Sequence, residues 1–159
     1  MVWGCFSSKG VGPLHRIDGT MDRWVYHTIL TQKAMTHIRK LMAQYPEVHR
    51  WTFAADNDPK HGAIENKNYL HKQVQEAGGR LKLMQRPSQS PDINPIEQLW
   101  NWVKDEIAKK IRRPENPNML WEWVKEVQTS SHVLIATLVE GMPRKVAALK
   151  RSRGGATKY

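Results

Sequence analysis

The chain has 159 residues, which is enough for one domain with a hydrophobic core and too few to suggest two such domains. Its 25 Lys and Arg residues outnumber its 15 Asp and Glu residues, and the net charge of +10 indicates a polyanionic partner, most commonly nucleic acid. The single Cys5 excludes an internal disulfide framework or a thiol cluster for zinc, and we expect it to be a small buried hydrophobe. Neither a secretion signal nor a membrane span is visible, so we expect an intracellular protein without membrane contact.

The chain opens with extended segments that lead into a long helix. Residues 2–6 are apolar and aromatic and predict a strand, and the segment VGPLHRI also predicts extended chain. Thr20 is the expected cap of an amphipathic helix that ends before Pro46. The inner face of this helix is expected to carry Trp24, Ile29 or Thr28, Met35, Ile38 and Met42.

Strands then alternate with helices. Residues 51–55 predict a short strand, and a helix is expected from about Gly62 to Ala77, where two glycines end it. Residues 81–84 alternate as a further strand. This order of elements is typical of an α/β fold.

The last third of the chain is expected to be helical. One helix carries Ile96, Leu99, Trp100, Val103 and Ile107 on its inner face, and the next carries Leu120, Trp123, Val124 and Val127. The segment HVLIATLVEGMP predicts a helix that ends at Gly141 and Pro143, before a basic tail. Trp102 and Trp121 have no obvious burial site, and we expect them to pack on each other, with absent domains or a partner as alternatives.

Two acidic residues follow predicted strands. Asp56 ends the strand at 51–55, and Glu97 opens the helix after the next strand. The carboxyl ends of strands in such sheets share one crevice, where clustered carboxylates can hold hard divalent cations. Other interpretations stay open at this point, because Asn94 to Glu97 also forms a capping box. Asp56 and Asp58 can equally form a turn, in which His61 would be a hydrogen-bonded turn histidine.

Four strings, in this order, resemble successive blocks of the Tc/mariner superfamily of DDE-type transposases: VWGCFSSKGVGPLHRIDGTMD, DNDPKH, PSQSPDINPIEQLW and MPRKVAALKRSRGGATKY. The resemblance covers nearly the entire chain. It implies an α/β, ribonuclease-H-like (DDE integrase/transposase) domain over residues 1–159, incomplete at its amino-terminal strands and with a helical carboxyl end. It also implies that Asp56 and Glu97 are two of three catalytic, metal-binding carboxylates, with Mg²⁺ or Mn²⁺ as the cofactor.

The sequence departs from that family pattern in two ways. The family's first catalytic aspartate and its helix-turn-helix domains precede the first block, and among the acids upstream of Asp56, namely Asp18, Asp22 and Glu47, we expect no replacement. The spacing between Asp56 and Glu97 is also longer than in the best-known branch. We therefore expect a catalytic-domain remnant in which metal occupancy is low and the chemistry is lost.

Basic residues form the expected DNA-contacting set: Lys60, His61, Lys109, Lys110, Arg112, Arg113, Arg144, Lys145, Lys150 and Arg151. Those in a last helical turn also complement the helix dipole, so a purely structural role stays open. The resemblance predicts a nuclear protein derived from a transposase, related to DNA transposition and integration by metal-dependent cleavage and strand transfer. Its expected partners are DNA and a second copy or the missing transposase domains. The alternative is a non-catalytic basic module that binds nucleic acid.

Overall fold

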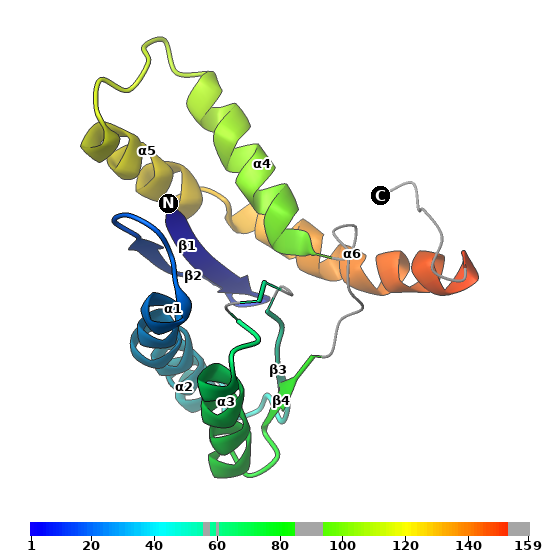
Figure 1. The fold of residues 1–159 in the computed structure, drawn as a ribbon. Coiled ribbons are helices and arrows are strands. Elements are labelled where there is room, and N and C mark those ends of the chain that lie inside the picture. The colour runs from blue at the N-terminus through cyan, green and yellow to red at the C-terminus, as the bar shows by residue number, and fades with distance from the viewer. Residues whose placement is uncertain (56–57, 60, 85–93, 153–159) are drawn as a thin grey trace. The chain divides into compact units, whose positions relative to one another are not determined.

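A computed structural model of the protein describes residues 1–55, 58–59, 61–84 and 94–152 (Figure 1). The chain divides into two compact units. The first contains Met1–Trp3 and His15–Gln89, and the second contains Gly4–Leu14 and Ser90–Tyr159. Strands and helices both occur, so the predicted mixture of the two is confirmed.

The first two strands form a hairpin. β1 (Val2–Ser7) pairs with β2 (Gly10–Arg16), which confirms both extended segments expected from the sequence. Gly10 has a φ of +115°, a conformation that residues with a Cβ rarely adopt. At Gly4, an added Cβ would lie 2.8 Å from the side chain of Leu14 and 3.0 Å from that of Trp100. Glycine at this position therefore permits close packing of the hairpin on α4 (Pro95–Ala108) within the second unit.

The long amphipathic helix is present as three consecutive segments. These are α1 (Arg23–Ile29), the π-helical turn η1 (Leu30–Ala34) and α2 (Met35–Gln44). The cap is Asp22 and not Thr20, because Asp22 Oδ1 accepts hydrogen bonds of 2.8 Å from the backbone N–H groups of Trp24 and Val25.

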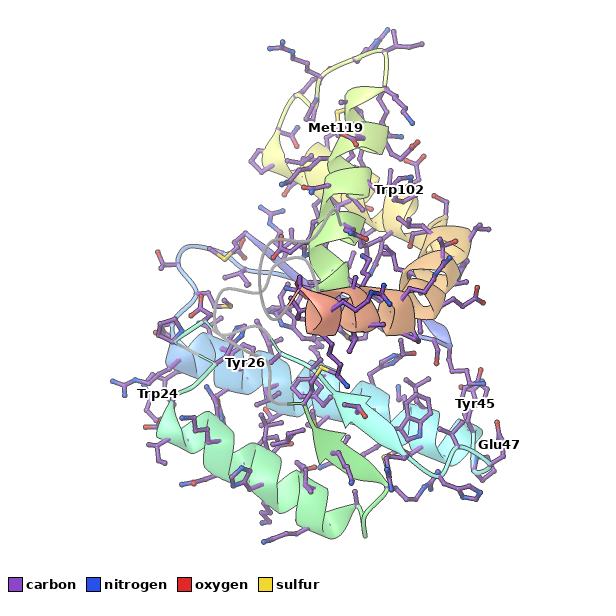
Figure 2. The ribbon with its side chains drawn as sticks, turned by 90° about the vertical axis from the view of Figure 1, so that its right-hand side faces the viewer. Trp24, Tyr26, Tyr45, Glu47, Trp102 and Met119 are labelled. Carbon is purple, nitrogen blue, oxygen red and sulfur yellow. The ribbon has the colours of Figure 1, made fainter. Side chains whose placement is uncertain are left out.

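The inner face of this helix differs from the prediction at its start. Trp24 is 57% exposed, whereas Tyr26 is 1% exposed, and Figure 2 shows the two side chains near the start of α1. A π-helical turn holds more residues than an α-helical turn, so it changes the phase of the buried face. A single period of 3.6 residues cannot fit both sides of η1. The buried positions are Tyr26, Ile29, Leu30, Ala34, Met35 and Leu41.

The end of α2 is held by an arginine from a distant part of the sequence. Arg80 Nη2 donates to the carbonyl oxygens of Met42 at 3.0 Å and Val48 at 3.2 Å. The last carbonyl groups of a helix lack partners within the helix, and a cation beside them also complements the helix dipole. Arg80 thus fixes the chain between α2 and the next strand.

A parallel strand–helix–strand unit follows. β3 (Trp51–Phe53) and β4 (Leu81–Leu83) pair in parallel with Trp51 opposite Leu81, and α3 (Ile64–Glu76) connects them (Figure 1). Both strands are shorter than predicted, and α3 lies within the predicted helix. Positive φ angles of 55° and 85° at Gly78 and Gly79 end the helix as expected.

The four strands of the described residues form two separate two-stranded sheets. The core of the first unit comes from the helices and the parallel strand pair. Its buried residues are Ile17, Met21, Tyr26, Ile29, Leu30, Ala34, Met35, Leu70 and Leu81.

The second unit contains the three remaining helices, α4 (Pro95–Ala108), α5 (Pro117–Thr129) and α6 (His132–Arg151). The core positions predicted for α4 and α5 are buried at Leu99, Val103, Val124 and Val127, but Leu120 is 40% exposed. No helix in the described ranges is long and apolar enough to span a membrane.

The prediction that α6 ends at Gly141 and Pro143 is wrong, because the helix continues to Arg151. A proline inside a helix removes one hydrogen bond and crowds the preceding turn. Packing on both sides of the proline opposes that cost, since Leu138 and Lys145 are both buried in this helix.

Candidate active site and nucleic-acid surface

The segment after β3 carries the first candidate carboxylate. Asp56 and Lys60 lie outside the described residues. Asp58 forms a turn through its backbone, since its carbonyl oxygen accepts from the N–H groups of His61 at 2.9 Å and Gly62 at 3.2 Å. This agrees with the turn-forming role considered for Asp58.

Glu97 lies in the first turn of α4, as the sequence predicts. The capping box is not formed: the Asn94 side chain makes no capping hydrogen bond, and the Glu97 N–H donates to the Asn94 carbonyl at 3.2 Å. The Glu97 side chain is exposed and forms no hydrogen bond or ion pair with the described residues. Its carboxylate is therefore available for a ligand, and the alternative role as a cap is wrong.

Two of the three acids upstream of Asp56, Asp18 and Asp22, have other partners. Asp18 forms an ion pair of 3.2 Å with Arg16 and is 87% exposed at its side chain. The Asp22 carboxylate caps α1. Among the residues that the structure describes, no three His, Cys, Asp or Glu side chains come together as a metal-binding group.

His61, expected to contact DNA, packs against the core of the first unit. Its ring stacks on Tyr26 with a centroid separation of 3.7 Å and an interplanar angle of 23°. The burial of Tyr26 was not predicted from the sequence, because the π-helical turn changes the phase of the apolar face. The sequence feature that could have indicated its burial is the spacing of four residues between Tyr26 and Leu30 on the same helix.

The basic residues after α4 fall into two groups. Lys109 pairs with Glu106 at 2.5 Å, and this hydrogen bond raises the pKa of Lys109. Lys110 donates to both carboxylate oxygens of Glu126 at 3.0 Å and so ties the end of α4 to α5. Arg112 and Arg113 are exposed and form no ion pair with described residues. Within this group of basic residues after α4, the two arginines are consequently the cations available to an external anion.

The basic residues of α6 also divide into two groups. Arg144, Lys150 and Arg151 are exposed. Lys145 is only 8% exposed and donates to Gln98 Oε1 at 2.7 Å. Burial lowers the pKa of Lys145. The prediction that Lys145 contacts DNA from the surface is therefore at odds with its position.

The expected packing of Trp102 on Trp121 is not confirmed by a ring contact between them among the described residues. Figure 2 labels Trp102 on α4, and both tryptophans are partly buried. The Trp121 ring lies 5.7 Å from the Nζ atom of Lys125. No ring contact joins the two tryptophans, which both belong to the described part of the chain.

Known structures define the class of the fold as that of a ribonuclease-H-like transposase catalytic domain. The Mos1 transposase catalytic domain, solved with raltegravir and manganese, matches with a TM-score of 0.80 at 16% identity, over 99% of this chain and 76% of that chain. Another structure of the catalytic domain of Mos1 mariner transposase also gives 0.80, at 17% identity, over 99% of this chain and 75% of that chain. The fold class expected from the sequence is confirmed.

The chain belongs to the DDE superfamily endonuclease family, whose model matches residues 18–119. The Tcb1 transposase of Caenorhabditis briggsae is 37% identical over 162 residues, and the Tc1 transposase of Caenorhabditis elegans is 35% identical over 162 residues. Each match includes 100% of this chain and 54% of the relative. The chain thus spans about half the length of these curated relatives, and the resemblance to Tc/mariner transposases is confirmed.

Proposed function

We propose that residues 1–159 form part of a DDE transposase catalytic domain that acts on DNA through Asp56 and Glu97. The two carboxylates are the metal ligands, and Mg²⁺ or Mn²⁺ is the ion. The observation that carries the proposal is the uncommitted carboxylate of Glu97 at the start of α4, in a chain that belongs to the DDE superfamily endonucleases. A carboxylate with no partner among the described residues suits a hard divalent cation, which binds oxygen ligands.

A bound divalent ion would lower the pKa of an attacking water and stabilise the leaving oxygen of a phosphodiester. Asp56 and Glu97 would hold such an ion through their carboxylate oxygens, and Glu97 would also orient the attacking water. The rigid helix α4 fixes the backbone of Glu97, since Leu99 and Val103 are buried on its inner face. The related Mos1 domain has been solved with manganese and with magnesium, which supports the choice of ions.

The exposed cations hold the DNA. Arg112, Arg113, Arg144, Lys150 and Arg151 are the exposed members of the expected set, and they contact phosphates without reading bases. Lys60, which lies outside the described residues, belongs to the same proposed surface, whereas Lys109 and Lys110 are engaged in ion pairs and contribute less. A Mos1 mariner paired-end complex is known, so we further propose that a second copy of the chain joins the DNA complex. Because its proposed substrate is chromosomal DNA, we propose that the protein acts in the nucleus.

We also propose that the 159-residue chain does not cleave DNA by itself. The two-metal mechanism requires enough oxygen ligands for two ions, and Asp18 and Asp22 are engaged elsewhere.

The experiment is an assay of nicking and joining on DNA that carries mariner-type ends, with Mg²⁺ or Mn²⁺. We expect neither product from the wild-type chain. Metal-dependent cleavage that disappears in both Asp56→Asn and Glu97→Gln would contradict the proposed inactivity while supporting the two assigned ligands.

A non-catalytic DNA-binding module is the second candidate, favoured by the exposed pair Arg112 and Arg113. It predicts the same salt-sensitive binding to DNA but no dependence of any property on the carboxylates. Metal binding that requires Asp56 and Glu97 separates the first candidate from the second.

A further inference from the structure

Two consecutive residues of α1 contact the segment that follows β3. Tyr26 stacks on His61 with a centroid separation of 3.7 Å, and His27 Nδ1 lies 2.9 Å from Asn66 Oδ1. Tyr26 is 1% exposed and Asn66 is fully buried, so both contacts reach the core of the first unit. α1 thus holds the segment at the turn and at the start of α3.

The contact between His27 and Asn66 fixes α3 on α1. A buried amide must find a hydrogen-bond partner, and the imidazole supplies one. The ring of Tyr69 meets His27 edge-on, with centroids 5.5 Å apart and an interplanar angle of 69°. The start of α3 therefore has a polar and an aromatic attachment to the same histidine.

The other end of the segment is fixed by the parallel strands. The Met84 N–H donates to the Phe53 carbonyl at 2.8 Å, and the Trp51 N–H donates to the Arg80 carbonyl at 2.7 Å. Phe53 and His61 are thus two anchored residues, and Asp56 lies between them in the sequence. The His61 N–H also closes the turn on the Asp58 carbonyl.

We propose that the stack of His61 on Tyr26 is the second anchor of the segment that carries Asp56, which makes both residues positioning residues for the aspartate. This inference rests on the proposed function, in which Asp56 is a metal ligand. Ligands must be held within a fraction of an ångström for tight binding, and residues behind the ligands supply that support. His61 thereby acts through the protein interior, and contact with DNA is not its main role.

The test changes His61 because Tyr26 is buried, and its truncation would leave a destabilising cavity in the core. His61→Ala removes the stack, and His61→Phe keeps an aromatic ring without the ring nitrogens. His71→Ala removes an exposed histidine from α3 and is the matched control. Hydrogen–deuterium exchange of residues 54–63 in the full chain without metal reports on the anchor directly. Mn²⁺ affinity, measured by electron paramagnetic resonance, reports on Asp56 as a metal ligand.

We expect His61→Ala to speed exchange in residues 54–63 by about 10-fold while exchange in α2 is unchanged. We expect the same variant to weaken Mn²⁺ binding by about 10- to 100-fold. His61→Phe restores both properties, and His71→Ala changes neither.

If residues 54–63 exchange as slowly in His61→Ala as in the wild type, the proposal is overturned. A His61→Phe variant as mobile as His61→Ala also overturns it, because the stack alone would then be insufficient. Failure of the proposed function is a separate result: Mn²⁺ binding that is absent, or unaffected by Asp56→Asn, removes the metal site. The exchange measurements still decide whether His61 anchors the segment.

Discussion

Lys145 Nζ lies 2.7 Å from Gln98 Oε1, and this hydrogen bond joins α6 to the first turns of α4. The lysine is 8% exposed and its partner is neutral, so burial of the charged form is poorly compensated and the pKa of Lys145 is lowered. The pair holds the helix that carries Glu97, in a region where an exposed cation was expected.

The lowered pKa of Lys145 predicts a pH dependence of stability. Between the lowered pKa and the ordinary value of 10.5, the unfolded chain binds more protons than the folded chain. The lysine's contribution to the free energy of unfolding therefore rises as pH increases through this window. We expect wild type to gain stability relative to Lys145→Met as pH approaches 10.5, as measured by urea unfolding at several pH values. A difference that does not change with pH would contradict the burial of the charge.

Cys5 provides a test of packing in the hairpin. Burial raises the pKa of its thiol to about 12, so almost no thiolate is present near neutral pH. We expect the native chain to react with a thiol reagent at pH 8 much more slowly than the chain in urea. Equal rates in the two states would mean that β1 is open to solvent.

Two glycines with different backbone conformations should respond oppositely to alanine. Gly79 has a φ of +85° and no atom within 4 Å of an added Cβ, so Gly79→Ala should cost about 1 kcal/mol of unfolding free energy through backbone strain alone. Gly141 lies inside α6, also without such a neighbour, and Gly141→Ala should stabilise the chain by about 1 kcal/mol through helix propensity. Denaturant unfolding measures both effects. Stabilisation by Gly79→Ala would contradict the helix end seen after α3.

DNA binding should depend on the arginines that have no described ion-pair partner. We expect weak, salt-sensitive binding that does not distinguish sequences, because phosphates are the groups that these cations recognise. Replacing Arg112 and Arg113 by glutamine should lower the slope of log affinity against log salt by about 2. A double change to glutamine at Lys33 and Lys40, which are exposed on the helix of the first unit, is the control for net charge.

Fluorescence anisotropy with a labelled duplex and its scrambled counterpart at several salt concentrations measures these slopes. The control variant should retain more of the wild-type slope than the arginine variant. Strong preference for one sequence at physiological salt, or equal losses in the two variants, would contradict a surface centred on Arg112 and Arg113.

The sequence predicted most elements because their signals are local. The two extended amino-terminal segments, α3 with its two terminal glycines, and the start of α4 at Pro95 follow from apolar runs, helix-ending residues and the position of proline. The face of α1 could not be predicted from one period, because η1 changes the phase between Tyr26 and Met35. The continuation of α6 past Pro143 depends on packing between helices, which local propensity does not contain.

The same distinction between local signals and tertiary contacts applies to the candidate site. Glu97 and the exposed arginines were predicted from motif and charge, since such features are visible in the sequence. The buried hydrogen bond of Lys145 and the ring stack of His61 were not predicted, because each depends on a tertiary partner, Gln98 or Tyr26. A lysine near the end of a basic chain gives no sign that it will be buried.

The most direct test of the account is a Mn²⁺ titration of the chain, followed by electron paramagnetic resonance. Wild type, Asp56→Asn and Glu97→Gln are compared, with Asp18→Asn as the control because Asp18 is an exposed acid paired with Arg16. We predict a weak site in wild type that is retained in Asp18→Asn and lost in Asp56→Asn and Glu97→Gln. Wild-type Mn²⁺ binding in both Asp56→Asn and Glu97→Gln would contradict the claim that these two carboxylates form the metal site.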